Sequence, residues 1–194
     1  GKIFYIMGKS SSGKDSIYRK LEADEELGLE RLVIYTTRPV RDGEKEGREY
    51  YFTDENRLEE FRKTNRLIES RAYHTVHGIW TYFTADDGQI NPQGTDYLGI
   101  GTLESYRKMK EYYGEETVCP IYIQVEDGER LQRALIREKQ QENPRYAEMC
   151  RRFLADQEDF SEENILAAGI RIRFENDDLD NCVRNIIKYI KSVT

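Results

Sequence analysis

The residues best suited to chemistry follow the first apolar run, where glycine, serine and lysine form the pattern G-x-x-x-x-G-K from Gly8 to Lys14. A loop of this composition lets successive backbone N–H groups turn toward phosphate oxygens. The N-terminus of the helix expected next adds partial positive charge, and Lys14 brings a full charge to the outer phosphates. An ordinary Ser/Gly turn is the competing interpretation, but the flanking strand and helix favour a nucleotide site. Its expected contacts are Gly8, Ser10, Ser11, Ser12, Gly13, Lys14, Asp15 and Ser16.

Asp15 departs from this motif, because the residue after the lysine is usually a Ser or Thr whose hydroxyl binds Mg²⁺. A carboxylate is also a hard oxygen ligand that suits this ion. Two consequences stay open. Asp15 either holds Mg²⁺, directly or through water, or its negative charge weakens binding of a triphosphate.

A second charged and aromatic cluster lies between Thr36 and Phe52, in the run TTRPVRDGEKEGREYYF. Arg38 and Arg41 carry planar guanidinium groups that suit bidentate contacts to phosphate. Nearby tyrosine hydroxyls can donate to the remaining phosphate oxygens. A solvated charged loop is the alternative, and the accompanying threonines, glycines and aromatic residues argue against it. We therefore expect a pocket for a nucleoside monophosphate.

These groups need a scaffold, and the chain alternates apolar strand-like runs with helical periods. Strands are expected at 2–7, 31–36, 48–52, 66–73, 78–84, 96–101, 117–125 and 170–175. Helices are expected at 14–26, 54–64, 103–113, 127–159 with a break near Asn143-Pro144, and 179–193. This alternation predicts an α/β fold, with a parallel sheet flanked by helices.

Composition limits the possible partners. The 194 residues fit one domain, and 30 basic against 37 acidic residues give a net charge of −7. An acidic chain binds nucleic acid and anionic membranes poorly. The three cysteines form no C-x-x-C pair, and His74 and His77 are too few to indicate a metal site. Without a membrane-length apolar run or a signal-peptide pattern, we expect a cytoplasmic protein, either monomer or homodimer.

The run from Thr36 to Phe52 resembles the T-T-R-x-x-R-x-G-E-x-x-G-x-x-Y-x-F signature of guanylate kinases. The segment from Glu175 to Asp180, ENDDLD, resembles the family's C-terminal N-D-D-L-D. The resemblance implies a P-loop NTPase-like sheet with an inserted α+β lobe for the monophosphate and a helical lid. The expected single domain 1–194 then divides into a core of 1–33, 89–129 and 160–194, a lobe of 34–88 and a lid of 130–159. The implied reaction is ATP- and Mg²⁺-dependent transfer of a phosphoryl group to a nucleoside monophosphate, with GMP to GDP as the first expectation.

The resemblance also assigns residues to roles. It places the acceptor's phosphate at Arg38, Arg41, Tyr50 and, more loosely, Tyr82. It places the acceptor's base at Glu69, with Thr84 as a further contact. It also implies that the transferred phosphoryl group is surrounded by Lys14, Arg38, Arg41, Arg133, Arg137 and Arg152. Asn176 is expected near adenine, and Asp15 near the metal. For any single arginine of the lid, an ordinary surface ion pair such as Arg152–Asp156 is an equal alternative.

Two positions depart from the family pattern. Ile34 stands where a serine is usual, and Gly101 stands where an acidic residue helps to read guanine and organise Mg²⁺; Glu104 is the nearest substitute. These changes leave open a kinase for another monophosphate, either a deoxynucleotide or a sugar phosphate. A non-catalytic module that binds protein ligands is a third hypothesis, which Asp15 favours and the pair Gly13-Lys14 disfavours.

Overall fold

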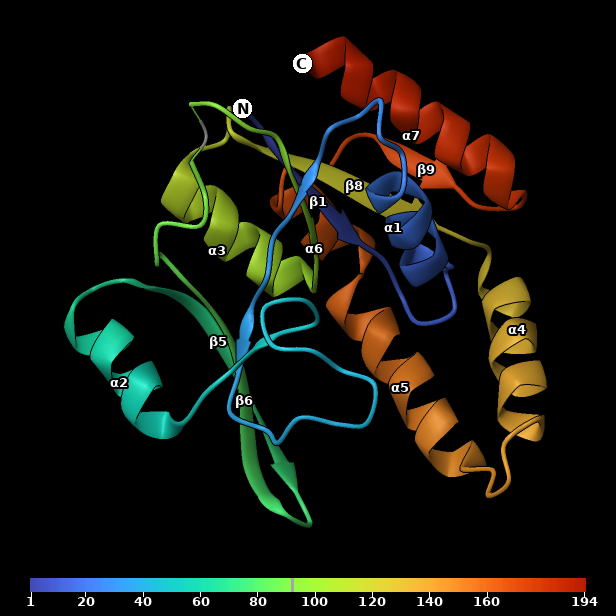
Figure 1. Ribbon diagram of the computed structural model, residues 1–194. Coiled ribbons are helices and arrows are strands. Elements are labelled where there is room, and N and C mark those ends of the chain that lie inside the picture. The colour runs from blue at the N-terminus through green and yellow to red at the C-terminus, as the bar shows by residue number, and fades with distance from the viewer. Residues whose placement is uncertain (92) are drawn as a thin grey trace.

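The computed structural model describes residues 1–91 and 93–194 and centres on a five-stranded parallel sheet (Figure 1). Its strand order is β2-β7-β1-β8-β9. The strands are β1 (Ile3–Met7), β2 (Glu30–Arg31), β7 (Tyr97–Ile100), β8 (Val118–Gln124) and β9 (Arg173–Glu175). Every residue of β1 is buried, as its apolar run predicts for a central parallel strand. The expected α/β class is therefore confirmed.

Helices cover both faces of this sheet because the side chains of β1 alternate between them. Phe4 and Ile6 pack with α1 (Lys14–Glu22) and α7 (Leu179–Val193). On the opposite face, Ile3, Tyr5 and Met7 pack with α3 (Leu103–Tyr113) and α6 (Glu162–Ala167). Within the described residues, none of the helices is both long and apolar enough to cross a bilayer.

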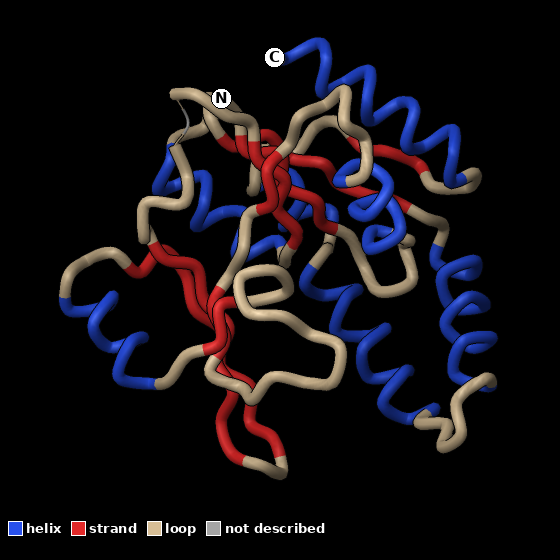
Figure 2. Tube along the Cα trace, viewed as in Figure 1, coloured by secondary structure: helices blue, strands red, loops and turns tan. Residues whose placement is uncertain are grey.

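A second sheet of four strands extends away from the first (Figure 2). Its order is β4-β3-β6-β5, formed by β3 (Tyr35–Thr36), β4 (Tyr51–Phe52), β5 (Leu67–Thr75) and β6 (Gly78–Ala85). Helix α2 (Glu55–Lys63) packs on it through Leu58 and Phe61. Asp54 caps this helix, since its carboxylate accepts a hydrogen bond from the Arg57 backbone N–H.

Several expected element boundaries are wrong. The strand expected at 31–36 is two strands in different sheets, because the Leu32 N–H bonds to Leu98 whereas the Ile34 carbonyl accepts from Tyr51. Helix α1 ends at Glu22 rather than at Glu26. In the turn that follows, the Asp24 carboxylate accepts a hydrogen bond from the Glu26 N–H. Strands β4 and β9 begin three residues later than expected, at Tyr51 and Arg173. Helix α6 is too short for its periodicity to be visible in the sequence.

The long charged helix breaks where the sequence predicts, giving α4 (Asp127–Lys139) and α5 (Tyr146–Asp159). The two helices lie side by side, and the end of α5 reaches the loop after β1 (Figure 1). In that loop, the Ser10 N–H donates to the Asp156 carboxylate at 2.7 Å. The α4–α5 hairpin is thereby joined directly to the glycine-rich loop.

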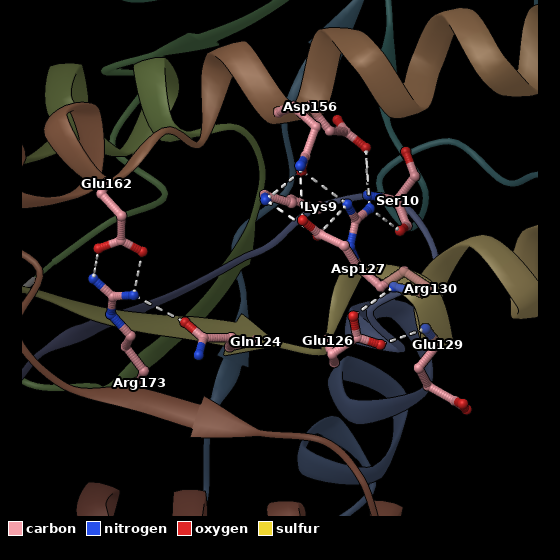
Figure 3. Close-up of polar contacts among 12 residues, drawn as sticks. Lys9, Ser10, Gln124, Glu126, Asp127, Glu129, Arg130, Asp156, Glu162 and Arg173 are labelled. Atoms are coloured by element: carbon pink, nitrogen blue, oxygen red, sulfur yellow. Dashed lines mark hydrogen bonds and ion pairs between the residues drawn. The ribbon is translucent and has the colours of Figure 1, made fainter.

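A buried guanidinium strengthens this junction (Figure 3). Arg130 on α4 is only 1% exposed and lies over the ring of Phe153. It donates to the Ser10 carbonyl at 3.0 Å, to Asp127 Oδ1 at 2.8 Å and to Gln157 Oε1 at 3.1 Å. A buried charge is tolerated only when such partners satisfy it. Arg130 therefore links the loop to both helices of the hairpin.

We expect Arg130→Met to lower the free energy of unfolding by about 2 to 4 kcal/mol, because it removes the donor to the Ser10 carbonyl and one of the donors to Asp127. Because the Asp127 side chain is 42% exposed, we expect a smaller loss of stability than for a wholly buried ion pair. Denaturant unfolding measures it.

The matched control is Arg151→Met on α5, which removes an exposed arginine paired with Glu148 and should leave stability almost unchanged. Equal stability of the two variants would contradict the role assigned to Arg130.

Candidate active site

The glycine-rich loop adopts a curled backbone between β1 and α1. Gly13 has a φ of +84°, in the left-handed region that favours glycine. A Cβ atom there would lie 2.3 Å from Asn176 Nδ2, so a larger residue has no room. Asn176 is buried, and its amide donates to the Ser12 carbonyl at 2.8 Å. Asn176 thus supports the loop, and its expected contact with adenine stays a prediction.

The Ser12 hydroxyl is buried in this loop and has no hydrogen-bond partner within residues 1–91 and 93–194. An unpaired buried hydroxyl is energetically costly. A phosphate oxygen bound in the loop would supply the acceptor that it lacks. The loop is therefore chemically suited to the anion that its sequence predicts.

A cavity of about 240 Å³ lies beside the loop and gathers residues from three elements. Its lining includes Ser10, Ser11, Lys14, Asp15, Arg137 and Arg152. Arg137 donates to the Ser11 hydroxyl at 3.0 Å. The cavity thus brings together four of the eight expected contacts of the glycine-rich loop and two of the expected lid arginines.

Arg133 has a different place. Its guanidinium donates to the Asn176 carbonyl and to Glu129, each at 3.0 Å, so it supports the segment behind the loop. Arg152 is exposed and forms its ion pair with Glu148 at 3.4 Å rather than with Asp156. Catalytic roles for these two arginines stay predictions.

Asp15 is exposed in the first turn of α1 and lines the same cavity as Lys14. Elsewhere in the described chain there is no group of three or more His, Cys, Asp or Glu side chains that could hold a metal ion. Mg²⁺ commonly takes one or two carboxylates together with substrate phosphates and waters. A single carboxylate beside a phosphate site fits an ion of this kind.

A second cavity, of about 380 Å³, opens on the four-stranded sheet. Its lining includes three of the expected acceptor residues, namely Arg41, Tyr50 and Tyr82, together with Ile34. The Arg41 guanidinium lies over the Trp80 ring, 5.8 Å from its centre. A cation beside two phenol groups can hold an anionic phosphate.

Arg38 lies behind this cavity and is 3% exposed. Its Nε donates to the Tyr82 hydroxyl at 2.9 Å, and its two Nη atoms donate to Glu44 at 2.8 and 2.6 Å. This hydrogen bonding from Arg38 lowers the pKa of Glu44 to about 2. In this form of the protein Arg38 therefore positions Tyr82, and its contact with phosphate stays a prediction.

Glu69 and Thr84, the two residues expected near the base, lie opposite each other on β5 and β6. The Thr84 hydroxyl donates to Glu69 Oε1 at 2.8 Å. Burial raises the pKa of Glu69, while the charge of Arg71 offsets part of the rise. Arg71 itself donates to Glu69 Oε2 at 3.1 Å. Arg71 was not among the expected site residues, although its place two residues along the same strand puts it on the same face as Glu69.

Tyr5 is a second residue that was not expected here. Its hydroxyl donates to Ser105 Oγ at 2.8 Å, and burial raises its pKa to about 12, so it stays neutral. A Cβ atom at Gly101 would lie 2.3 Å from this hydroxyl. Tyr5 thus occupies the space of an acidic side chain at position 101. Glu104 is exposed on α3, where it lines the neighbouring cleft.

That cleft, of about 1080 Å³, joins the two halves of the site. Gly8, Ser10 and Lys14 line one side, and the β5 residues from Ser70 to Tyr73 line the other. Arg71 and Tyr73 line both this cleft and the 380 Å³ cavity, so the glycine-rich loop and the cavity that contains Arg41 and Tyr50 adjoin one another. This arrangement can bring two phosphate-bearing ligands together.

Comparison with known proteins agrees with this geometry. The family model described as guanylate kinase matches residues 1–193. The guanylate kinase of Porphyromonas gingivalis is 29% identical over 97% of this chain and 96% of its own length. That of Coxiella burnetii is 26% identical over 98% of this chain and 86% of its own. A crystal structure of guanylate kinase from Anaplasma phagocytophilum superposes with a TM-score of 0.63 at 21% identity, covering 99% of this chain and 85% of that one, and so supports the fold. By the family match along nearly its whole length, the chain belongs to the guanylate kinase family.

Proposed function

We propose that this protein transfers a phosphoryl group from ATP to GMP and releases ADP and GDP. Membership of the guanylate kinase family supports the reaction. The observation that best supports this reaction is one cleft that is lined both by Lys14 of the glycine-rich loop and by β5 of the four-stranded sheet. A binding module that only held a monophosphate would have no use for Lys14 or for Arg137 beside it.

In the proposed reaction, an oxygen of the GMP phosphate attacks the γ-phosphorus of ATP, and the bond to the β–γ bridging oxygen breaks. The acceptor is already an anion, so no strong general base is needed. Phosphoryl transfer is catalysed mainly by positioning and charge. Lys14 and Arg137 hold the donor, while Arg41 and Tyr50 hold the acceptor. Asp15 would hold a Mg²⁺ ion that binds with ATP, and this ion would supply positive charge that offsets the charge of the phosphates.

The lobe and lid boundaries belong to the same proposal. The Gln89 side chain bonds to both the N–H and the carbonyl of Val33, so a segment of 34–88 leaves and rejoins the core at one place. A lid of 130–159 corresponds to most of the α4–α5 hairpin. Movement of both parts over the cleft would exclude water and suppress hydrolysis of ATP.

The first test is an ADP-release assay with Mg-ATP and a panel of acceptors: GMP, dGMP, AMP, CMP, UMP and ribose 1,5-bisphosphate. We expect turnover with GMP and dGMP and little with the others. The filled space at Gly101 makes another monophosphate the second candidate. Turnover with a different acceptor would replace GMP, and folded protein that binds ATP without turnover would contradict catalysis.

We expect Arg41→Lys to lower kcat/KM for GMP by about 10- to 100-fold, because an ammonium replaces the guanidinium fork with a point charge. Arg48→Lys is the matched control, since Arg48 lies in the same loop and is exposed. Steady-state kinetics on both variants decide the point. Near-normal turnover by Arg41→Lys would remove Arg41 from the site.

The raised pKa of Glu69 predicts a pH dependence of GMP binding. Only the ionised carboxylate can accept hydrogen bonds from the N–H groups of guanine at both oxygens, so affinity should fall as the pH drops through this pKa. The fall should begin above the ordinary carboxyl range. Calorimetric titration with GMP at several pH values measures it.

The phosphate of GMP titrates in a neighbouring range, so Glu69→Gln supplies the baseline. This variant should bind GMP more weakly at neutral pH and lose the part of the pH dependence that belongs to Glu69. Identical pH profiles for the two proteins would exclude Glu69 as the titrating group.

A further inference from the structure

The base end of the site is the part around Glu69, where the acceptor's base is expected to bind. Here the side chain that lines the cavities is Arg71 and not Glu69. The Glu69 side chain is 3% exposed, and the Arg71 side chain is 17% exposed. Arg71 lines both the 380 Å³ cavity and the 1080 Å³ cleft, whereas Glu69 lines neither. An acceptor that enters therefore meets a guanidinium beside the carboxylate.

The guanidinium is held in place but keeps unused donors. Its Nε and Nη2 donate to the two oxygens of Glu69, at 3.1 and 3.5 Å. Among the residues that the structure describes, its Nη1 group forms no hydrogen bond to a side chain or carbonyl. Guanidinium cannot deprotonate in proteins, so these N–H groups are always available. Arg71 is thus fixed on one side and open on the other.

In the described part of the chain, Glu69 is the carboxylate that forms an ion pair with Arg71, while the exposed Glu104 lines the same cleft without pairing with it. Tyr5 fills the space beside Gly101, with its Oη 2.3 Å from where a Cβ would lie, and its hydroxyl is committed to Ser105. Next to Gly101 the site therefore offers an acceptor group, Glu69, beside a donor group, Arg71. A ligand edge that matches it carries an N–H donor next to a hydrogen-bond acceptor.

We propose that Arg71 is a specificity-determining residue, which donates to O6 of the acceptor's base while Glu69 accepts from N1–H. This inference rests on the proposed GMP kinase activity. Guanine offers N1–H beside O6, and arginine is a frequent donor to O6 and N7 of guanine. Adenine offers an unprotonated N1 beside an amine, so the N–H groups of Arg71 would face the N–H groups of that amine. Arg71 thus selects 6-oxopurines over 6-aminopurines.

The test compares GMP with 6-thio-GMP, which keeps N1–H and the 2-amine but replaces O6 with a weaker acceptor. Binding and kcat/KM are measured for the unmodified protein, for Arg71→Met and for Arg107→Met. Arg107 lines the same cleft from α3 and serves as the control for loss of positive charge. Circular dichroism and thermal unfolding verify that each variant is folded.

We expect Arg71→Met to lose about 10- to 100-fold in kcat/KM for GMP, with most of the loss in KM. The unmodified protein should prefer GMP to 6-thio-GMP by about tenfold, and Arg71→Met should nearly abolish that preference, whereas Arg107→Met keeps it. If Arg71 only held Glu69 in place, both ligands would weaken equally and the preference would persist, which would overturn the inference.

Failure of the proposed function gives a different result. In that case the unmodified protein would turn over neither GMP nor 6-thio-GMP. A protein that phosphorylates GMP but whose preference for O6 survives Arg71→Met keeps the function and loses only the inference.

Discussion

The glycine-rich loop must keep a curled backbone open toward the cleft, and the rest of the site depends on this constraint. Three of its backbone groups are satisfied from outside the loop: Asn176 bonds to the Ser12 carbonyl, Arg130 to the Ser10 carbonyl and Asp156 to the Ser10 N–H. Buried backbone groups without such partners would cost free energy comparable to a lost hydrogen bond. These hydrogen bonds attach α4, α5 and the segment after β9 to the loop. The attachment places Arg137 and Arg152 in the same cavity as Lys14.

The arginines near the two cavities fall into two groups, those that are buried against partners and those that line a cavity. Arg130 and Arg38 are buried and fully engaged with carboxylates and carbonyl groups, so they fix the shape of the two phosphate-binding regions. Arg137 and Arg41 line cavities. Removing a buried member of the first group costs stability, while removing a cavity-lining member costs binding. One residue type thus serves two purposes, separated by burial.

The base end of the site follows from a steric fact about β1. Tyr5 faces α3, and its ring and hydroxyl lie against Gly99 and Gly101. Larger side chains at either glycine would collide with Tyr5, so the acidic residue expected from the family pattern is replaced by a neutral phenol. Glu69 is left with Arg71 and Thr84 as its partners. The proposed recognition of the base then depends on a donor–acceptor pair, Arg71 and Glu69, two residues apart on one strand.

Much of this protein can be predicted from local sequence. The run from Ile3 to Met7, the loop ending at Lys14, the cap at Asp54 and the break near Pro144 are local signals, because hydrophobic period, capping and backbone restriction act over a few residues. The arginines of the loop after Thr36 are visible for the same reason. The family and its chemistry follow from these motifs.

The tertiary structure decided what depends on distant partners. The run from Arg31 to Thr36 is uniformly strand-like, yet its two ends join different sheets. The Leu32 N–H bonds to Leu98 in one sheet, whereas the Ile34 carbonyl accepts from Tyr51 in the other. The burial of Arg130, the use of Asn176 as a support and the pairing of Arg71 with Glu69 also depend on contacts made by the fold. Sequence by itself determined which groups are available. Only packing, through burial and hydrogen-bond partners far along the chain, decided which of them line the cavities and which hold the structure together.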